Sequence, residues 1–257
     1  MRHTQEWRAF LQEVEDKRGA LRFERDEECL YRGHADTSWP LLPTLLRHCQ
    51  RANIKHRSKI RDLESALFFE FRPRASELHA GPVTDWDVLF FMRHHGVATR
   101  LLDWTEVLGV AIYFALATAA PEPRPCIWLL NPYALNQVSW EIADFVAPEY
   151  LPQGDYSYAE YLTDYGEDAG FDWDKPVAIY PEQKSKRLRA QRGYFTIHGE
   201  KIAPLDKLVP SAVQKVELPP AAVRDAREFL AAAGIDEELL FPDLDALARY
   251  LHRKYEI

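Results

Sequence analysis

An arginine followed by a glycine at the end of an expected strand is the first group in the sequence that could do chemistry. Tyr31, Arg32 and Gly33 follow the short apolar run that begins at Cys29. A guanidinium at a strand end can grip a phosphate or carboxylate through two parallel hydrogen bonds. A bare glycine peptide offers a donor and an acceptor side by side, as a carboxamide requires. The alternative is structural: the arginine pairs with an internal acid and the glycine makes a turn.

A second polar segment, residues 94–105, lies between two apolar helices and contains two adjacent histidines, Arg100, Asp103 and Trp104. Arg100 and Asp103 are candidates for an internal ion pair, and Asp103 is equally a candidate cap for the helix that follows. Adjacent residues on a helix point about 100° apart, and no HxxxH pattern or nearby cysteine completes a set with the histidines. The spacing therefore does not predict a metal site.

Two further helices carry candidate residues. Tyr113 lies on a nearly all-apolar helix, where an aromatic ring is usually part of the core but can also offer a face to a flat heterocycle. Arg187 and Gln191 are four residues apart and share one face of a basic helix that meets a strand at Gly193. That face either points into a cleft or belongs to a surface helix that the glycine terminates.

Hydrophobic periodicity predicts the elements that must position these residues. Expected helices carry Trp7 to Val14, Ile60 to Phe71 (stopped by Pro73), Val88 to Met92 (capped by Thr84 and Asp87), Val107 to Ala117, a segment from Pro219-Pro220 to Gly234, and Leu244 to Leu251 (capped by Asp243). Expected strands are 29–31 (ending at Arg32-Gly33), 126–130, 177–180, 194–198 and 213–218. Helices and strands do not alternate strictly, so we expect an α+β fold, with a mixed or antiparallel sheet packed by several helices in a single domain over residues 1–257.

Charge is distributed unevenly along the chain, whose net charge is −8. Residues 141–182 hold 11 acidic residues and one basic residue, together with many aromatic residues, and are expected to form a long polar insertion. Residues 47–74 and 184–192 are locally basic. Such stretches are either solvated faces or contacts for a phosphate-bearing partner, and they slightly favour a nucleic acid.

Composition excludes several classes of protein. No apolar run approaches the roughly 20 residues of a membrane helix, and the first ten residues lack an apolar signal core. The three cysteines, Cys29, Cys49 and Cys126, are odd in number and widely spaced, which argues against a disulfide framework or a CxxC metal knuckle. We therefore expect a cytoplasmic protein that has no membrane partner.

Five ordered sequence blocks resemble the FRG domain family. They are Tyr-Arg-Gly with Trp-Pro-Leu-Leu-Pro-Thr-Leu-Leu-Arg, His-His-Gly-Val-Ala-Thr-Arg-Leu-Leu-Asp-Trp-Thr, Ala-Ile-Tyr-Phe-Ala, Arg-x3-Gln-x-Gly-x-Phe-Thr, and Phe-Pro-Asp-Leu-Asp at 241–245. Tyr31 stands where the family usually has Phe, and His95 and Ala98 stand where it usually has Tyr and Pro. Family members often occur in bacterial and phage-defence settings.

Some members of this family look like ADP-ribosyltransferases, and the resemblance implies that NAD is the substrate and that no metal is needed. It also implies a split sheet like that of those enzymes. The implied NAD-binding residues are Tyr31, Arg32, Gly33, Arg100, Asp103, Trp104, Tyr113 and Arg187, and the implied catalytic contact with the ribose comes from Gln191, Glu182 or Glu200. The acceptor would be RNA (favoured), DNA or protein, and a toxin or defence effector of this kind implies an antitoxin or regulatory partner.

Two other functions fit the same residues. One is a binding module without chemistry, in which Arg32 and Arg100 hold a nucleotide or another phosphorylated ligand. The other is a nuclease or phosphodiesterase, in which His94 or His95 acts as acid and base and Asp103 binds a metal or orients the histidine. No GxGxxG is followed by an acidic residue, so a dinucleotide-binding Rossmann unit is not expected.

Overall fold

The computed structural model describes most of the chain outside the acidic segment. The described residues are 3–24, 27–78, 83–117, 124–141, 144–145, 147–148, 175–181, 186–199 and 201–255. The predicted insertion at 141–182 therefore lies mostly outside the described residues.

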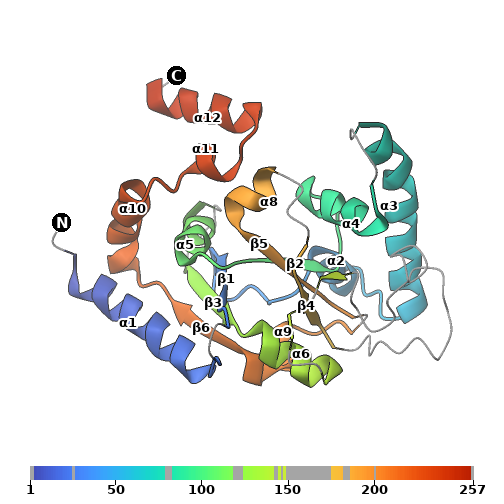
Figure 1. Ribbon diagram of the computed structural model, residues 1–257, viewed down its shortest axis with the longest axis horizontal. Helices are drawn as coiled ribbons and strands as arrows, with labels where there is room; N and C mark the ends of the chain where they lie inside the picture. The colour runs from blue at the N-terminus through green and yellow to red at the C-terminus, as the bar shows by residue number, and fades with distance from the viewer. Residues whose placement is uncertain are drawn as a thin grey trace.

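A six-stranded antiparallel sheet organises the fold (Figure 1). Its strands, in the order in which they lie side by side, are β4 (Val177–Ile179), β5 (Gly193–Ile197), β2 (Leu101–Thr105), β1 (Leu30–His34), β3 (Cys126–Leu130) and β6 (Val213–Glu217). The sheet and the helices around it confirm the α+β prediction. All the expected strands are present. The sequence predicted that β1 would end at Arg32 and Gly33, but the strand continues through these residues to His34.

The sheet is weakly joined between its two middle strands. β1 and β3 share five Cα partner pairs, as do β2 and β5, whereas β1 and β2 share a single pair, Tyr31 with Thr105. We call this junction the seam. It divides the sheet into one half made of β4, β5 and β2 and another made of β1, β3 and β6.

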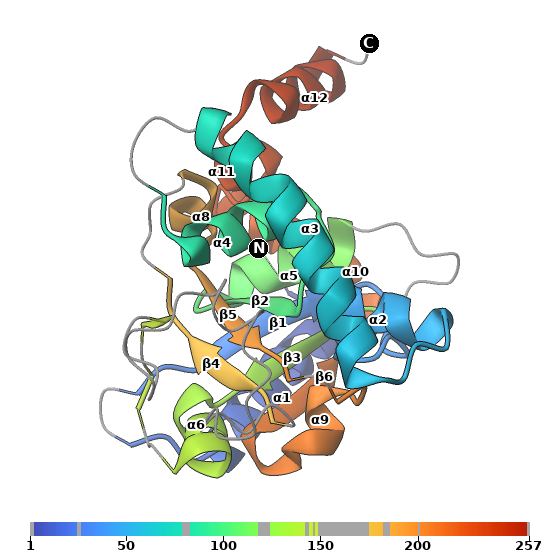
Figure 2. The same ribbon diagram turned by 90° about the vertical axis from the view of Figure 1, so that its right-hand side faces the viewer.

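The helices cover both faces of the sheet and one end of the molecule (Figures 1 and 2). They are α1 (Gln5–Ala20), α2 (Thr44–Arg51), α3 (Arg57–Leu78), α4 (Asp85–His94), α5 (Leu108–Ala117), α6 (Pro132–Trp140), α8 (Lys186–Gln191), α9 (Leu205–Leu208), α10 (Val223–Ala232), α11 (Glu237–Leu240) and α12 (Leu244–Tyr255), with 3-10 turns at Pro210–Ala212 and Pro220–Ala222. α1, α5 and α10 lie on the left of Figure 1, and α2, α3 and α4 lie on the right.

Local sequence signals account for most of these helices. Trp7, Phe10 and Val14 are the buried stripe of α1. The predicted capping box of α4 is present, because the Thr84 side chain accepts from the Asp87 N–H and the Asp87 carboxylate accepts from the Thr84 N–H. Asp243 caps α12, because its carboxylate accepts from the Ala246 N–H at 2.7 Å, and Gly234 follows the end of α10.

Pro73 does not stop α3, contrary to the prediction. The helix runs from Arg57 to Leu78 with the proline inside it. A proline at this position removes the hydrogen bond to the carbonyl of Phe69, whose residue is 42% exposed. The helix tolerates this loss on a side that borders solvent.

Three hydrophobic cores of the described residues pack against the sheet, and a fourth, which includes Leu46 and Ile60, joins α2 to α3. One core joins α1, α5 and α10 to β1, β3 and β6 through residues such as Trp7 and Ala111. A second joins α3 and α4 to β2, β4 and β5 through residues such as Leu89 and Phe195. On the opposite face of the sheet, a third core, which includes Leu30 from one half and Leu102 from the other, spans both halves. The two halves are thus covered separately on one face and together on the other.

Among the described residues, no helix combines the length and the apolar content that a membrane-spanning segment needs.

Candidate functional site

A cavity of about 630 Å³ opens at the seam. Its walls come from β1, α2, α4, β2, α5, α8 and β5, so both halves of the sheet contribute. The volume lies within the range of roughly 300–1,000 Å³ that is usual for small-molecule sites. The first two candidate segments of the sequence analysis, which are about 60 residues apart, meet here.

Arg32 spans the seam. Side chains alternate between the faces of a strand, and Leu30, two residues earlier, packs on the face opposite to α5. The Arg32 guanidinium nonetheless reaches β2, where Nη1 donates to the carbonyl of Asp103 at 2.7 Å and lies 3.4 Å from its carboxylate. Burial lowers the pKa of Arg32 to about 10, so it stays charged at neutral pH. A side chain thus makes the cross-strand contact that the backbones do not make here.

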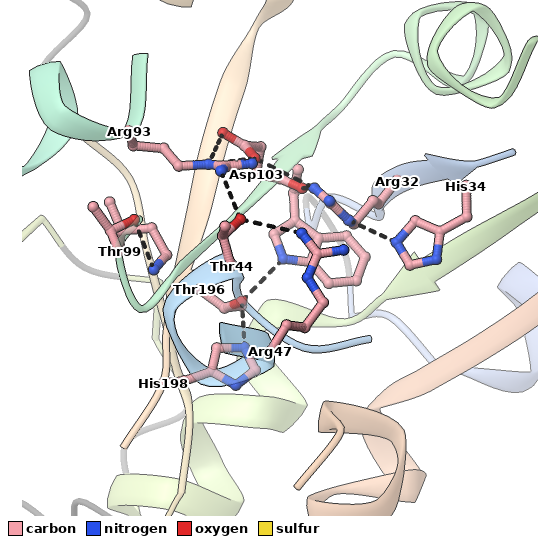
Figure 3. Close-up of polar contacts among 11 residues, drawn as sticks. Arg32, His34, Thr44, Arg47, Arg93, Thr99, Asp103, Thr196 and His198 are labelled. Carbon is pink, nitrogen blue, oxygen red and sulfur yellow. Dashed lines mark hydrogen bonds and ion pairs between the residues drawn. The ribbon is translucent and has the colours of Figure 1, made fainter. Parts of the chain in front are cut away.

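Asp103 is the anionic centre of the cavity (Figure 3). Arg93, at the end of α4, donates from Nε to both carboxylate oxygens at 3.1 and 2.9 Å, and its Nη2 also bonds to Oδ2. Burial raises the pKa of Asp103, but the charge and hydrogen bonds of Arg93, with the charge of Arg32, outweigh burial and lower it to about 2. The carboxylate is therefore ionised at any physiological pH.

A threonine at the start of α2 links this centre to another cation. Thr44 Oγ1 accepts from Arg93 Nη1 at 3.3 Å and from Arg47 Nη2 at 3.1 Å (Figure 3). Arg47 lines the cavity and, within the described part of the chain, forms no ion pair with a carboxylate. Burial, followed by the charges of Arg93 and Arg51, lowers the pKa of Arg47.

Arg187 brings a fourth cation from α8. Its Nη1 donates to the carbonyl of His94 at 3.2 Å, and its guanidinium lies 4.5 Å from the centre of the Phe241 ring. No acidic partner is found for it among the described residues. Gln191, one turn later on the same helix, donates from Nε2 to the carbonyl of Leu240 at 3.0 Å. Both residues line the cavity, so this helix face points into a cleft, one of the two alternatives left open by the sequence.

Aromatic rings form much of the remaining wall. Phe90 of α4 stacks on Phe195 of β5 with ring centres 5.0 Å apart, and Phe114 of α5 also lines the cavity.

His34 accepts from Arg32 Nε at 3.0 Å, and burial with the charges of Arg32 and Arg47 lowers its pKa to about 3. His34 is therefore neutral, and the positive charge of the cavity comes from arginine.

Gly33 has a packing role that the sequence analysis did not anticipate. A Cβ at this position would lie 1.9 Å from the carbonyl oxygen of Ala111 and 2.6 Å from the backbone nitrogen of Ala115. The glycine therefore allows α5 to pack directly on β1, beside the cavity that Gly33 also lines.

The structure brings together most of the residues that the sequence singled out. The cavity-lining ones are Tyr31, Arg32, Gly33, His94, His95, Asp103, Trp104, Arg187 and Gln191. Tyr113 does not line the cavity and packs against the core of α1, α5 and α10, whereas its neighbour Phe114 faces the cavity. Glu182 and Glu200 lie outside the described residues.

Arg100 requires a correction, because it lies in the interior, away from the cavity. Its side chain is 1% exposed, and Nε donates to Glu64, also 1% exposed, at 2.7 Å, while Nη1 donates to the carbonyl of His198. The predicted pair with Asp103 is absent, and Asp103 is part of β2 rather than a helix cap. Residues three apart along an extended chain are about 10 Å apart and point to opposite faces, which prevents that pair.

Sequence reasoning did not identify Arg47 and Arg93 as site residues. Arg47 closes the first block of the family resemblance, and Arg93 immediately precedes the two histidines. Their roles depend on how α2 and α4 pack beside the seam, which no local spacing records.

Among the described residues, no cluster of three or more His, Cys, Asp and Glu side chains is arranged to hold a metal ion. The carboxylate of Asp103 is already bonded to arginines.

Comparison with known proteins gives one match. The family model of the FRG domain matches residues 27–123. This match includes every described cavity-lining residue except Arg187, Leu188, Gln191 and Phe195, and the last two blocks of the resemblance fall outside it. No curated protein and no solved structure matches the chain. The segment that builds the seam and most of the cavity wall therefore belongs to the FRG domain family.

Proposed function

We propose that this protein is a NAD-dependent ADP-ribosyltransferase and that NAD binds in the cavity at the seam. The observation that carries the proposal is the charge arrangement there: one ionised carboxylate, Asp103, is held between Arg32 and Arg93, and two more arginines without carboxylate partners in the described part of the chain flank it. This arrangement of arginines suits a ligand that carries several negative charges close together, as the pyrophosphate of NAD does.

The proposed reaction breaks the bond between the ribose C1′ and the nicotinamide nitrogen, and the electron pair leaves with nicotinamide. An oxygen or nitrogen of the acceptor then bonds to C1′ and loses a proton. The transition state resembles an oxocarbenium ion, as in glycoside hydrolysis, and an ionised carboxylate stabilises such a cation. We assign this role to Asp103, which requires that the bound ligand displace one of its two arginine partners. Gln191 supports the ribose contact, because its amide oxygen remains to accept from a hydroxyl when its nitrogen is bonded to Leu240.

The remaining parts of NAD find matching groups. Arg47 and Arg187 are the cations available for the pyrophosphate, since Arg32 and Arg93 already neutralise Asp103. Phe114 and the stacked pair Phe90 and Phe195 offer ring faces to the nicotinamide or adenine. The seam supports the split sheet that the family resemblance implies, because a single residue pair joins β1 to β2.

A non-catalytic nucleotide-binding module is the second candidate, and one observation favours it. The two described carboxylates on the wall are both engaged: Asp103 is bonded to arginines and Asp87 closes the capping box of α4. If Asp103 cannot leave its partners, the cavity binds a nucleotide without cleaving it. The nuclease alternative has less support at His94, because burial and the charge of Arg187 lower the pKa of His94 to about 4, which makes this histidine a weak base.

The test measures NAD binding by calorimetry and nicotinamide release by chromatography. The variants Arg47→Gln and Arg187→Gln remove cations without leaving a carboxylate unpaired in the described part of the structure. Loss of one phosphate contact by a charged donor is expected to weaken NAD binding by about ten-fold or more. Arg8→Gln and Arg189→Gln are the controls, because these arginines, on α1 and α8, are exposed and do not line the cavity.

The outcomes separate the two candidates. Release of nicotinamide that falls with Arg47→Gln and Arg187→Gln but not with the controls supports the transferase. Binding that depends on the same arginines without any release, in the presence of RNA, DNA and protein acceptors, supports the module. Equal NAD binding by all four variants and the unchanged protein refutes both.

A transferase of this kind would modify components of its own cell, so we also expect an antitoxin or regulatory protein. Recovery of the protein from its native cells without a stoichiometric partner would count against this part of the proposal.

A further inference from the structure

We propose that a basic strip along α2 and the start of α3 binds the phosphate backbone of a single-stranded nucleic acid, and that this strand is the acceptor of the ADP-ribosyl group. The strip consists of Arg47, Arg51, Lys55 and Lys59. The acceptor role rests on the proposed function, whereas binding of the strand does not.

The charges of the strip are available to a ligand. Arg51, Lys55 and Lys59 are exposed, and none of the three forms an ion pair within the described residues. The sequence has no acidic residue from Thr44 to Arg61. Isolated surface cations are common, but a run of them without an interspersed acid concentrates positive potential on one part of the surface.

The first turn of α3 supports a functional reason for these charges. The amino end of a helix carries a partial positive charge, so acidic side chains there are stabilising and basic ones are not. α3 begins at Arg57, includes Lys59 and has no acidic residue in its first turn. An unfavourable charge in a first turn, such as that of Lys59, costs about 0.3–1 kcal/mol of helix stability.

The acidic residues closest to the strip do not cancel it. Glu64 points into the interior, where Arg100 neutralises it. Asp62 is exposed and, in the described segment from Thr44 to Glu64, is the acidic residue whose side chain faces solvent. The strip therefore keeps a clear positive excess.

The strip leads directly into the cavity. Arg47 is on the cavity wall, and Arg51 lies one turn further along the same face of α2. Trp39, in the connection that enters α2, also lines the cavity and is half-buried, with its ring 6.2 Å from that of His34. Figure 2 shows α2 and α3 together on one side of the molecule. A strand whose phosphates follow the strip would thus deliver a nucleotide to the cavity mouth.

The basic strip and the Trp39 ring together favour a single-stranded nucleic acid over an acidic protein or a duplex. Proteins that bind single strands combine a positive track for the backbone with aromatic side chains on which bases stack. Trp39 supplies such a ring beside the track, a feature that an acidic peptide does not need. A duplex keeps its bases inside the stack, where the cavity cannot reach them.

The test measures binding of fluorescein-labelled 20-nucleotide oligo(dT) and oligo(U) by anisotropy over a range of salt concentrations, without NAD. The variant carries Arg51→Gln, Lys55→Gln and Lys59→Gln, and Arg47 stays unchanged because it belongs to the cavity. Each phosphate contact with a single strand contributes about 0.7 to the slope of log K against log salt. We therefore expect the variant to lose about 2 units of that slope and to bind at least ten-fold more weakly at low salt.

A charge-matched control carries Arg8→Gln, Lys17→Gln and Arg227→Gln. These residues lie on α1 and α10, on the opposite side of Figure 1, and the variant has the same net charge as the strip variant. We expect its slope and affinity to stay close to those of the unchanged protein.

Three results would overturn the inference. The first is no salt-sensitive binding of either oligonucleotide, and the second is an equal loss in the two triple variants. The third is a polyglutamate peptide that binds the strip more tightly than the oligonucleotides, which would identify an acidic protein partner. Nicotinamide release is measured separately: strand binding that depends on the strip without any release would contradict the transferase and leave a nucleic-acid-binding surface.

Discussion

The buried pair of Arg100 and Glu64 gives the sharpest test of the distinction between structural and ligand-binding arginines. Both side chains are 1% exposed and are joined at 2.7 Å. Glu64→Gln keeps the size of the side chain but leaves the Arg100 charge without its counter-ion in the interior. Breaking a buried pair in this way costs about 3–5 kcal/mol. In a chain of this length that corresponds to a fall in Tm of about 6 to 20 °C.

The assay is urea unfolding followed by tryptophan fluorescence, with Glu70→Gln as the matched control. Glu70 is on the same helix and forms an exposed pair with Arg74, so its loss is expected to cost less than about 1 kcal/mol. The double variant Glu64→Leu with Arg100→Met removes both charges and is expected to recover most of the stability. If the double variant folds but no longer binds NAD while the unchanged protein does, the assignment of Arg100 to the interior is refuted.

Three further perturbations have predicted signs. Gly33→Ala is expected to lower the free energy of unfolding by several kcal/mol, measured by urea unfolding, because its Cβ would overlap the Ala111 carbonyl and α5 would have to move; unchanged stability would contradict the packing described here. His34 and His198 are buried and their pKa values are lowered to about 3, so between about pH 6 and pH 4 each of these two imidazoles binds up to about one more proton in the unfolded chain than in the folded one. Stability should therefore fall as the pH falls, by about 1.4 kcal/mol per pH unit for each histidine, and a flat profile would show that they are protonated in the fold. Pro73→Ala should raise the stability by up to about 3 kcal/mol, measured by thermal unfolding, and a loss would mean that the proline fits a bend the helix needs.

Short-range patterns predicted the elements well. The stripe of Trp7, Phe10 and Val14, the capping box of Thr84 and Asp87, and the apolar run of β3 each contain enough information to define an element without the rest of the chain. These features depend on interactions within one or two turns, or within one strand, which is why the sequence reveals them.

Pairings across the chain were much less predictable. Arg100 and Asp103 are close in sequence, yet each has its partner on a distant helix, Glu64 on α3 and Arg93 on α4. The sequence shows which residues carry charge but not which face of a strand each occupies, and a shift of one residue reverses the face. Arg47 was not predicted as a site residue for the same reason, because only the packing of α2 beside the seam places it on the cavity wall.

The sequence could predict the cavity only in part, because the cavity lies between elements. Tyr31, Arg32 and Asp103 were expected to contribute to a site from their types and their neighbours, and all three line one cavity. Tyr113 and Phe114 show the limit of such reasoning, since adjacent residues on a helix point in different directions and only Phe114 faces the cavity.

The seam also determines what a ligand of the cavity would disturb. The wall formed by α5 belongs to one hydrophobic core, and the wall formed by α4 belongs to another. The third core joins the two halves on the opposite face. On the side of the cavity, the bonds of Arg32 to Asp103 are a side-chain link between β1 and β2. A ligand that competes for Arg32 would therefore remove a charge partner of Asp103 and a link across the seam at the same time.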